Sequence, residues 1–185
     1  LIFLGCGTSY FAALIGINYI KKINNFNTTQ LFDGAEFESK DIPLIGNTAL
    51  ILISQSGETR DLYRCIEIGR DNNLFIIGIV NVVDSMIARE VDCGIYLNCG
   101  REVGVASTKC FTSQVIAIFM MSIWFCQVDD NDDNNNKNNK NNNNICSKYL
   151  QDFRNLPNQI KNTIELCKDQ IKEKNILELF LKRES

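Results

Sequence analysis

Short, continuous apolar runs alternate along this chain with longer segments in which apolar residues recur every three or four positions. The short runs are typical of strands buried on both faces, and the longer segments of helices that cover a sheet. Strands are predicted near 1–4, 28–32, 48–53, 74–80 and 92–97, and helices near 9–22, 59–70, 85–90, 107–127 and 147–173. This alternation predicts an α/β fold: a three-layer, doubly wound, five-stranded parallel sheet with strand order 2-1-3-4-5.

The turn after the third predicted strand, with the sequence S-Q-S-G-E-T at 54–59, carries the clearest candidate chemistry. Ser54, Ser56 and Thr59 supply neutral hydroxyl donors, and Gly57 lets the backbone approach a ligand closely. The helix that follows adds unpaired N–H groups and a partial positive charge. The turn matches neither common nucleotide-binding loop, so it predicts a phosphate cradle of another kind. A strand-to-helix connection with an ordinary hydroxyl cap is the alternative.

A second turn of the same kind, Gly5–Ser9, follows the first predicted strand. With the predicted strand order, both turns lie at the point where the order reverses, outside the carboxyl ends of the strands. Ligands of open α/β sheets bind there, so the pair favours a ligand site.

A third stretch, 102–114, joins the last strand to a long apolar helix, with Ser107 or Thr108 as the predicted N-cap. Lys109 then falls in the first turn, where the helix dipole disfavours a cation. Either an anionic partner lies nearby or the side chain leans into solvent. The small dipole penalty, ~0.3–1 kcal/mol, favours the second reading.

Four motifs follow one another here as they do in one known family. They are G-C-G-T-S-Y at 5–10, I-S-Q-S-G-E-T at 53–59, N-V-V-x-S-x-x-A-R-E at 81–90 and E-V-G-V-A-S-T-K-x-F-T at 102–112. Together they resemble the sugar isomerase (SIS) domain, with its flavodoxin-like strand order. More narrowly, they resemble the first SIS module of the glucosamine-6-phosphate synthase family, the isomerizing glutamine–fructose-6-phosphate aminotransferases. The resemblance is close over 1–127 and resumes weakly at 156–160.

The resemblance implies a hexose-6-phosphate ligand, such as fructose-6-phosphate or glucosamine-6-phosphate. Carried over by position, it implies that the phosphate is held by Ser54, Gln55, Ser56 and Thr59, with Thr8 and Ser9 beside it, and that Cys6, Gly7, Val105 and Ser107 face the sugar. It also implies a homodimer.

No catalytic residue, metal ligand or cofactor is assigned to this chain. In the resembled family, an imine-forming lysine, a proton-transferring glutamate and a ring-opening histidine come from a second SIS module and its tail. Ammonia comes from a separate glutaminase domain. This chain contains no histidine, so we expect it to be a piece of a longer enzyme and inactive alone.

Two other functions stay open from the sequence. The first is another SIS phosphosugar isomerase or deglycase, against which the stretch 102–112 argues. The second is a non-catalytic SIS module that senses phosphosugars and regulates a partner, which the missing acid–base residues favour.

Composition narrows the class of protein further. The net charge is −3 with scattered Lys and Arg, so no nucleic acid partner is expected. The longest apolar run, Val115–Phe125, is too short to span a bilayer, so no membrane partner is expected.

The eight cysteines form no C-x-x-C pair, and no histidine accompanies them. Reduced thiols in a cytoplasmic protein are therefore expected, with neither a zinc site nor a disulfide framework. No base is evident beside Cys6, so a contact role is expected for it.

Residues 129–144 form a low-complexity insert, because ten of the fourteen residues from Asn131 to Asn144 are Asn. An insert without apolar residues cannot offset its ordering entropy and is predicted to be disordered. The predicted organisation is a SIS domain at 1–128, this insert, and an exit helix with the start of a linker at 145–185, leading to a second SIS module outside this chain.

Overall fold

The computed structural model describes residues 1–104, 107–129 and 139–173. Contacts divide the chain into two units, Leu1–Asp129 and Asp130–Ser185. Within the described residues the elements are β1 (Ile2–Gly5), α1 (Thr8–Ile23), β2 (Gln30–Asp33), the 3-10 helix η1 (Ser39–Asp41), β3 (Ala49–Ser54), α2 (Arg60–Asp71), β4 (Phe75–Val80), α3 (Met86–Glu90), β5 (Cys93–Tyr96), α4 (Lys109–Asp129) and α5 (Asn139–Glu173). Each predicted strand and helix is present, whereas η1 was not predicted.

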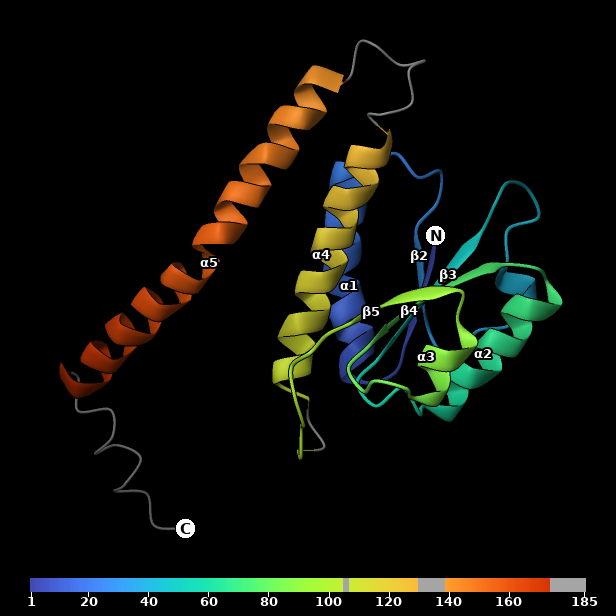
Figure 1. Ribbon diagram of the computed structural model, residues 1–185, viewed down its shortest axis with the longest axis horizontal. Coiled ribbons are helices and arrows are strands. Elements are labelled where there is room, and N and C mark those ends of the chain that lie inside the picture. Colours follow the sequence, from blue (N-terminus) through green and yellow to red (C-terminus); the bar gives the residue numbers. More distant parts are fainter. Residues whose placement is uncertain (105–106, 130–138, 174–185) are drawn as a thin grey trace. The chain divides into compact units, whose positions relative to one another are not determined.

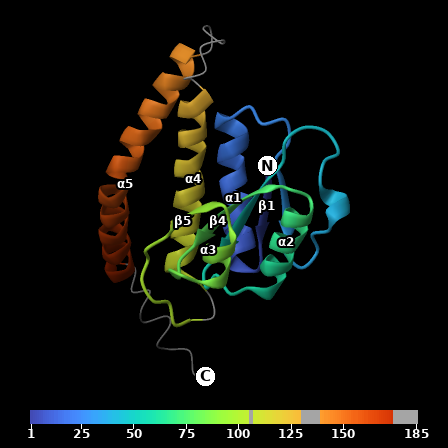
Figure 2. The same cartoon turned by 45° about the vertical axis from the view of Figure 1, so that its right-hand side comes forward.

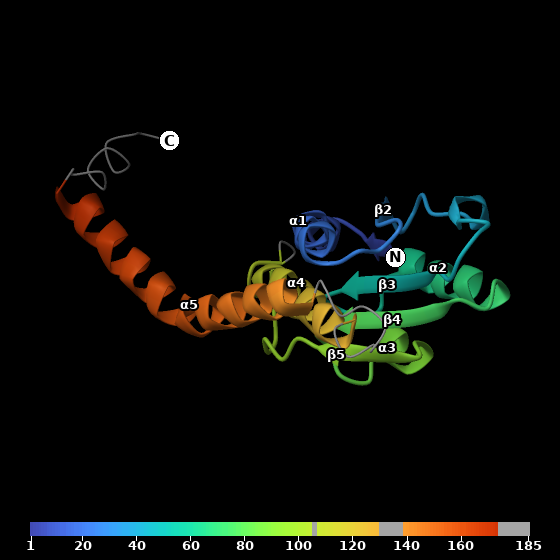
Figure 3. The same cartoon turned by 90° about the horizontal axis from the view of Figure 1, so that it is seen from above.

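The five strands of the first unit form one parallel sheet in the order β2-β1-β3-β4-β5. Helices α1 and α4 lie side by side on one face, and α2 and α3 cover the other (Figures 1 and 2). From above, the strands follow one another across the sheet in this order (Figure 3). The predicted α/β fold and strand order are confirmed.

Burial on both faces of the sheet explains the unbroken apolar runs. Leu50 and Leu52 of β3 pack into the cluster that contains α2 and α3. Ile51 and Ile53 pack into the opposite cluster, against α1 and α4. All four side chains are fully buried, and each burial contributes about 1.5–3 kcal/mol. The central strands are therefore rigid supports for the turns at their ends.

Helix α4 buries one face and leaves another exposed. Ala117, Ile118 and Met121 pack into the core with α1 and the sheet. Met120 and Trp124, the single tryptophan, are 50% and 57% exposed. By length and composition alone, 109–128 could cross a bilayer, a longer stretch than the apolar run suggested. Its buried face is what a core helix shows.

In the second unit, the described residues form α5, which continues through Pro157. Its start at Asn139 lies eight residues before the predicted one. Residues 139–144, predicted as part of the disordered insert, are thus helical, because the helix extends N-terminally beyond its apolar segment. Residue 129 belongs to α4, and the rest of the insert, 130–138, lies outside the described residues.

Candidate functional site

A cavity of about 550 Å³ opens at the carboxyl ends of β1 and β3. It is lined by Cys6, Gly7, Thr8, Ser9, Ile53, Ser54, Gln55, Ser56, Thr59, Gly104 and Ser107. Nine of the ten residues predicted for the site are among them, and the tenth, Val105, lies outside the described residues. Segments that are far apart in sequence therefore share one cavity, at the predicted switch point of the sheet.

The turn between β3 and α2 is shaped by its own hydroxyls. The buried Ser54 Oγ accepts a hydrogen bond from the Gly57 N–H at 2.9 Å and lies 3.0 Å from Thr59 Oγ1. Ser56 Oγ accepts from the Glu58 N–H at 3.1 Å. Thr59 is the N-cap of α2, yet its side chain makes no capping bond, because it pairs with Ser54 instead. The N-terminus of α2 thus keeps backbone donors for a ligand.

The same turn is locked against the beginning of α3. Gly57 has a φ of +68°, and a Cβ there would lie 2.0 Å from Ser85 Oγ. The Gly57 carbonyl accepts from the Ile87 N–H at 2.9 Å. The Glu58 carboxylate accepts from the Met86 N–H at 2.8 Å and so caps α3. Only glycine fits between these contacts, which explains its place in the motif.

The turn between β1 and α1 is held in place by a residue of α4, which is distant in the sequence. Gly7, the N-cap of α1, has a φ of +54° and no side chain to cap the helix. Ser9 Oγ accepts a buried hydrogen bond of 3.0 Å from Gln114 Nε2 of α4. The second hydroxyl turn is thereby tied to α4, 105 residues further along.

The Cys6 thiol lies at the cavity wall in its neutral form. Burial, and after it the negative charge of Asp33, raise the pKa of this thiol to about 11. A thiol with such a pKa is a poor nucleophile at neutral pH. This agrees with the contact role expected from the sequence.

Glu102 organises the loop before α4, which contributes Gly104 and Ser107 to the cavity lining. Its carboxylate accepts hydrogen bonds from the backbone of Thr108 (2.6 Å), Lys109 (2.9 Å) and Cys110 (3.4 Å). The hydroxyls of Ser107 and Thr108 also donate to it, at 2.9 and 3.1 Å. Hydrogen bonds from the Cys110 thiol, Thr108, Ser107 and Lys109 hold the pKa of this carboxyl well below its usual range. An ionised carboxylate therefore caps α4.

Thr108 directly precedes α4, at one of the two predicted N-cap positions. Its hydroxyl and that of Ser107 donate to Glu102, and the Glu102 carboxylate accepts from the first N–H groups of the helix in their place. Lys109 Nζ donates to the Arg101 carbonyl oxygen at 2.9 Å, and its side chain is exposed. An anionic partner is thus not needed to explain this lysine.

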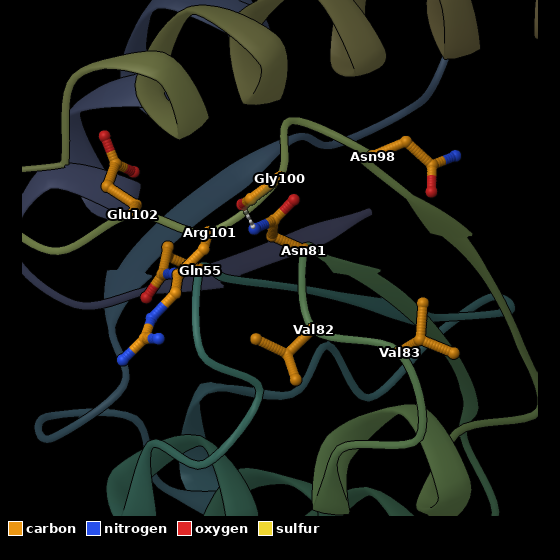
Figure 4. A pocket seen from close by; sticks show the side chains of 8 residues that line it. All are labelled: Gln55, Asn81, Val82, Val83, Asn98, Gly100, Arg101 and Glu102. Carbon is orange, nitrogen blue, oxygen red and sulfur yellow. Dashed lines mark hydrogen bonds between the residues drawn. The ribbon is translucent and has the colours of Figure 1, made fainter.

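A second hollow of about 480 Å³ adjoins the first (Figure 4). Gln55 lines both hollows, and Arg101 lies beside it. Asn81 fixes the chain there: its Nδ2 donates to the Gly100 carbonyl at 2.8 Å, and its Oδ1 accepts from the Cys99 N–H at 3.0 Å. Arg101 therefore lies on a loop whose backbone is tethered by Asn81.

The described lining of the 550 Å³ cavity carries no Lys, Arg, Asp or Glu. Its donors are hydroxyls, an amide and the N-terminal ends of α1 and α2. Such a set suits a phosphate group bound without a metal. Among residues 1–104, 107–129 and 139–173, no cluster of His, Cys, Asp or Glu could hold a metal ion.

Sequence reasoning missed the roles of Glu102, Asn81 and Gln114. Glu102 belongs to the last of the four motifs, but nothing in the sequence shows that its carboxylate folds forward onto 107–110. Gln114 carried a weak signal, an amide within an apolar helix. Its Nε2 donates to Ser9 Oγ, and its buried Oε1 has no hydrogen-bond partner among the described residues.

The sequence matches the profile of the SIS domain family over residues 1–123. It is 44% identical over 180 residues to a protein of Acanthamoeba polyphaga mimivirus named "Probable glutamine--fructose-6-phosphate aminotransferase (isomerizing)", covering 97% of this chain and 27% of that protein. It is 32% identical over 183 residues to glutamine--fructose-6-phosphate aminotransferase (isomerizing) 2 of Mus musculus, covering 99% of this chain and 25% of that protein. This chain thus spans about a quarter of these relatives' length.

A solved structure of a protein with a name of the same kind is also similar to this chain. The C-terminal domain of glucosamine-fructose-6-phosphate aminotransferase from Francisella tularensis superposes with a TM-score of 0.67 and 26% identity. The match covers 83% of this chain and 41% of that one.

Proposed function

The chain belongs to the SIS domain family, and on that premise we propose that it is the sugar-phosphate-binding module of an isomerizing glutamine–fructose-6-phosphate aminotransferase. Its ligands are fructose-6-phosphate and glucosamine-6-phosphate. One observation carries the proposal: the described residues of both hydroxyl turns and of the loop before α4 line a single cavity. The similarity to enzymes of this name supports the choice of ligand.

The phosphate end of the ligand lies at the N-terminus of α2. There it accepts hydrogen bonds from the hydroxyls of Ser56 and Thr59 and from the first backbone N–H groups of the helix. The Gln55 amide adds a donor on the side of the second hollow.

The sugar end lies toward the β1–α1 turn and the wall before α4. Ser107 lines that wall, with its hydroxyl positioned by Glu102. Cys6 presents a neutral thiol and Gly7 leaves open space, since nothing lies within 4 Å of a Cβ built there. These groups orient sugar hydroxyls and do not transfer protons.

The chain alone is not expected to turn the ligand over. Its cavity offers no histidine, lysine or carboxylate as acid, base or imine-forming group within the described lining. General acid–base catalysis is typically worth ~10²–10⁴-fold. Purified chain should therefore form neither glucose-6-phosphate nor glucosamine-6-phosphate. The homodimer is likewise a proposal, which sedimentation of the purified chain tests.

A non-catalytic phosphosugar sensor is the second candidate. The uncharged lining favours it, because a sensor needs binding groups only. The two candidates separate when the remaining part of the aminotransferase is added: an enzyme module restores turnover, and a sensor does not.

The binding proposal is tested by calorimetry on the full 185-residue chain. Fructose-6-phosphate and glucosamine-6-phosphate should bind, fructose should not, and inorganic phosphate should compete. Equal binding of fructose and fructose-6-phosphate would overturn the assignment of a phosphate site.

A further inference from the structure

Two free thiols face each other at the base of the loop that carries Glu102. Cys99 follows β5, and Cys110 is the second residue of α4. Their Sγ atoms lie 3.0 Å apart. Cys110 is fully buried, whereas Cys99 is partly exposed. The contact joins the two ends of the loop, and one of its two residues is partly exposed.

Separate anchors hold the two cysteines in place. The Asn81 Oδ1 accepts from both the N–H and the thiol of Cys99, each at 3.0 Å. The Asn81 Nδ2 bonds the next residue, Gly100, as Figure 4 shows. On the other side, the Glu102 carboxylate accepts from the Cys110 N–H at 3.4 Å. The backbone is thus fixed on both sides, and the sulfurs need to approach by only about 1 Å to reach the bonding distance of ~2.05 Å.

We propose that Cys99 and Cys110 are a modification site: a thiol pair that a peroxide oxidises to an intrachain disulfide. Cys99 reacts first, since it is the accessible member. Its thiolate, formed by loss of the proton to water, attacks one peroxide oxygen. The O–O bond breaks, Cys99 becomes a sulfenic acid, and hydroxide leaves and takes up a proton. The Cys110 sulfur then attacks the Cys99 sulfur, and the leaving hydroxide takes the Cys110 proton as water. Two electrons pass from the thiols to the peroxide, and the net products are one disulfide and two waters.

The division of roles agrees with the environment of Cys110. Burial and its hydrogen bonds to Glu102 and Cys99 raise the pKa of the Cys110 thiol far above its ordinary value. A thiol of this kind reacts slowly with a peroxide in solution but is held against an adjacent sulfenic acid. The pair therefore stays reduced until Cys99 is oxidised.

Formation of the disulfide would change the hydrogen bonds of Glu102, and through them the position of Ser107 in the sugar-facing wall. The Cys110 thiol is a donor to this carboxylate, which also positions the Ser107 hydroxyl. Oxidation removes that donor. This consequence rests on the proposed function: sugar-phosphate affinity should fall several-fold in the oxidised chain.

The test uses the full chain with Cys93→Ser and Cys167→Ser, because these two thiols are exposed and would react independently. The chain is treated with hydrogen peroxide, alkylated under denaturing conditions, digested and analysed by mass spectrometry. A peptide linking Cys99 to Cys110, lighter by two hydrogens and restored by dithiothreitol, is expected. Cys99→Ser in the same background is the matched control and should yield no link.

Three results would overturn the proposal: a sulfinic acid on Cys99 without a link, a link between Cys6 and Cys65 in its place, or a link that survives in the control. Calorimetry with fructose-6-phosphate is then run on reduced and oxidised protein. Unchanged affinity in the linked protein overturns the coupling to the site. Absence of binding in both forms contradicts the proposed function and leaves the disulfide result unaffected.

Discussion

Four helices begin at the same edge of the sheet. Two of them have a carboxylate that caps the N-terminus, and two have no capping side chain. Helices α3 and α4 are capped by carboxylates, Glu58 on the Met86 N–H and Glu102 on the N–H groups of 108–110. Helices α1 and α2 have no capping side chain at Gly7 or Thr59. The two open N-termini are those that border the cavity.

This difference leaves the partial positive charge of two helix N-termini available to a ligand. A helix N-terminus attracts an anion, and a resident carboxylate satisfies that attraction within the protein. Where the carboxylate is missing, an external phosphate can take its place. The first-turn carboxylate of α2, Asp61, is exposed and is not part of the cavity lining. The open N-termini of α1 and α2 thus keep unpaired N–H groups beside the cavity, whereas those of α3 and α4 are satisfied within the protein.

The largest effect is expected from Gly57→Ala, which disturbs the open turn before α2. The new Cβ would meet Ser85 Oγ, and alanine would have to adopt the left-handed region. These two costs together amount to about 2–4 kcal/mol of unfolding free energy. Urea unfolding measures it.

Gly46→Ala is the matched control, since Gly46 has a φ of +90° and nothing within 4 Å of its Cβ position. It should lose only the conformational part. Equal losses in the two variants would mean that the contact with Ser85 adjusts freely.

Ser56→Ala tests whether α2 receives the phosphate. A hydrogen bond to a charged group is worth about 1.5–3 kcal/mol, so affinity for fructose-6-phosphate should fall roughly tenfold to a hundredfold. Thr163→Ala removes a hydroxyl on α5 that bonds the Gln159 carbonyl, and it should leave affinity unchanged. Calorimetry that finds the Ser56 variant as tight as its parent would exclude that hydroxyl from the site.

Glu102→Gln replaces the charged cap of α4 by a neutral one. We expect the melting temperature to fall by a few degrees, the scale of a lost helix cap. The pKa of Glu102 is lowered from 4.5 in the folded chain. As the pH falls below that value, the unfolded state takes up a proton before the native state does, so stability is lost with acid.

The variant should therefore show a shallower loss of stability below that pH than the parent. Glu165→Gln, an exposed partner of Lys168, serves as the control. Identical acid-melting curves for the parent and the Glu102 variant would contradict the role of this carboxylate.

Arg101→Ala is expected to have the smallest effect. Its side chain is exposed and lies on the loop of the second hollow, beside Gln55 (Figure 4). Screening at physiological salt reduces an exposed charge to a weak contribution, so affinity should change by less than about threefold. The effect should grow at low salt. A loss of tenfold or more would show that Arg101 contacts the phosphate directly.

The framework of this site could be predicted because its signals are local. Runs such as Leu50–Ile53 mark strands, a parallel sheet fixes which turns meet, and Gly57 marks a close approach. The partners of those turns could not be predicted. Gln114 bonds Ser9 across 105 residues, and Glu102 caps a helix that begins seven residues later. Such pairings depend on how α4 packs, which neither periodicity nor residue type encodes.

The same limit applies to the hydroxyls of Thr59 and Thr108, which directly precede α2 and α4. Residue type does not show that these hydroxyls pair with Ser54 and Glu102 rather than capping their helices. The Cys99–Cys110 contact was likewise hidden, because the spacing of eleven residues carries no known pattern.

The single tryptophan lies on the exposed side of α4, so its intrinsic fluorescence reports on that surface. Trp124 is 57% exposed and adjoins the ring of Phe125, with centroids 5.2 Å apart. Its fluorescence comes from one known position, outside the lining of the sugar-phosphate cavity. Ligand titrations should therefore leave the emission nearly constant. A shift to shorter wavelength on raising the protein concentration would instead report that another surface has covered this face of the helix.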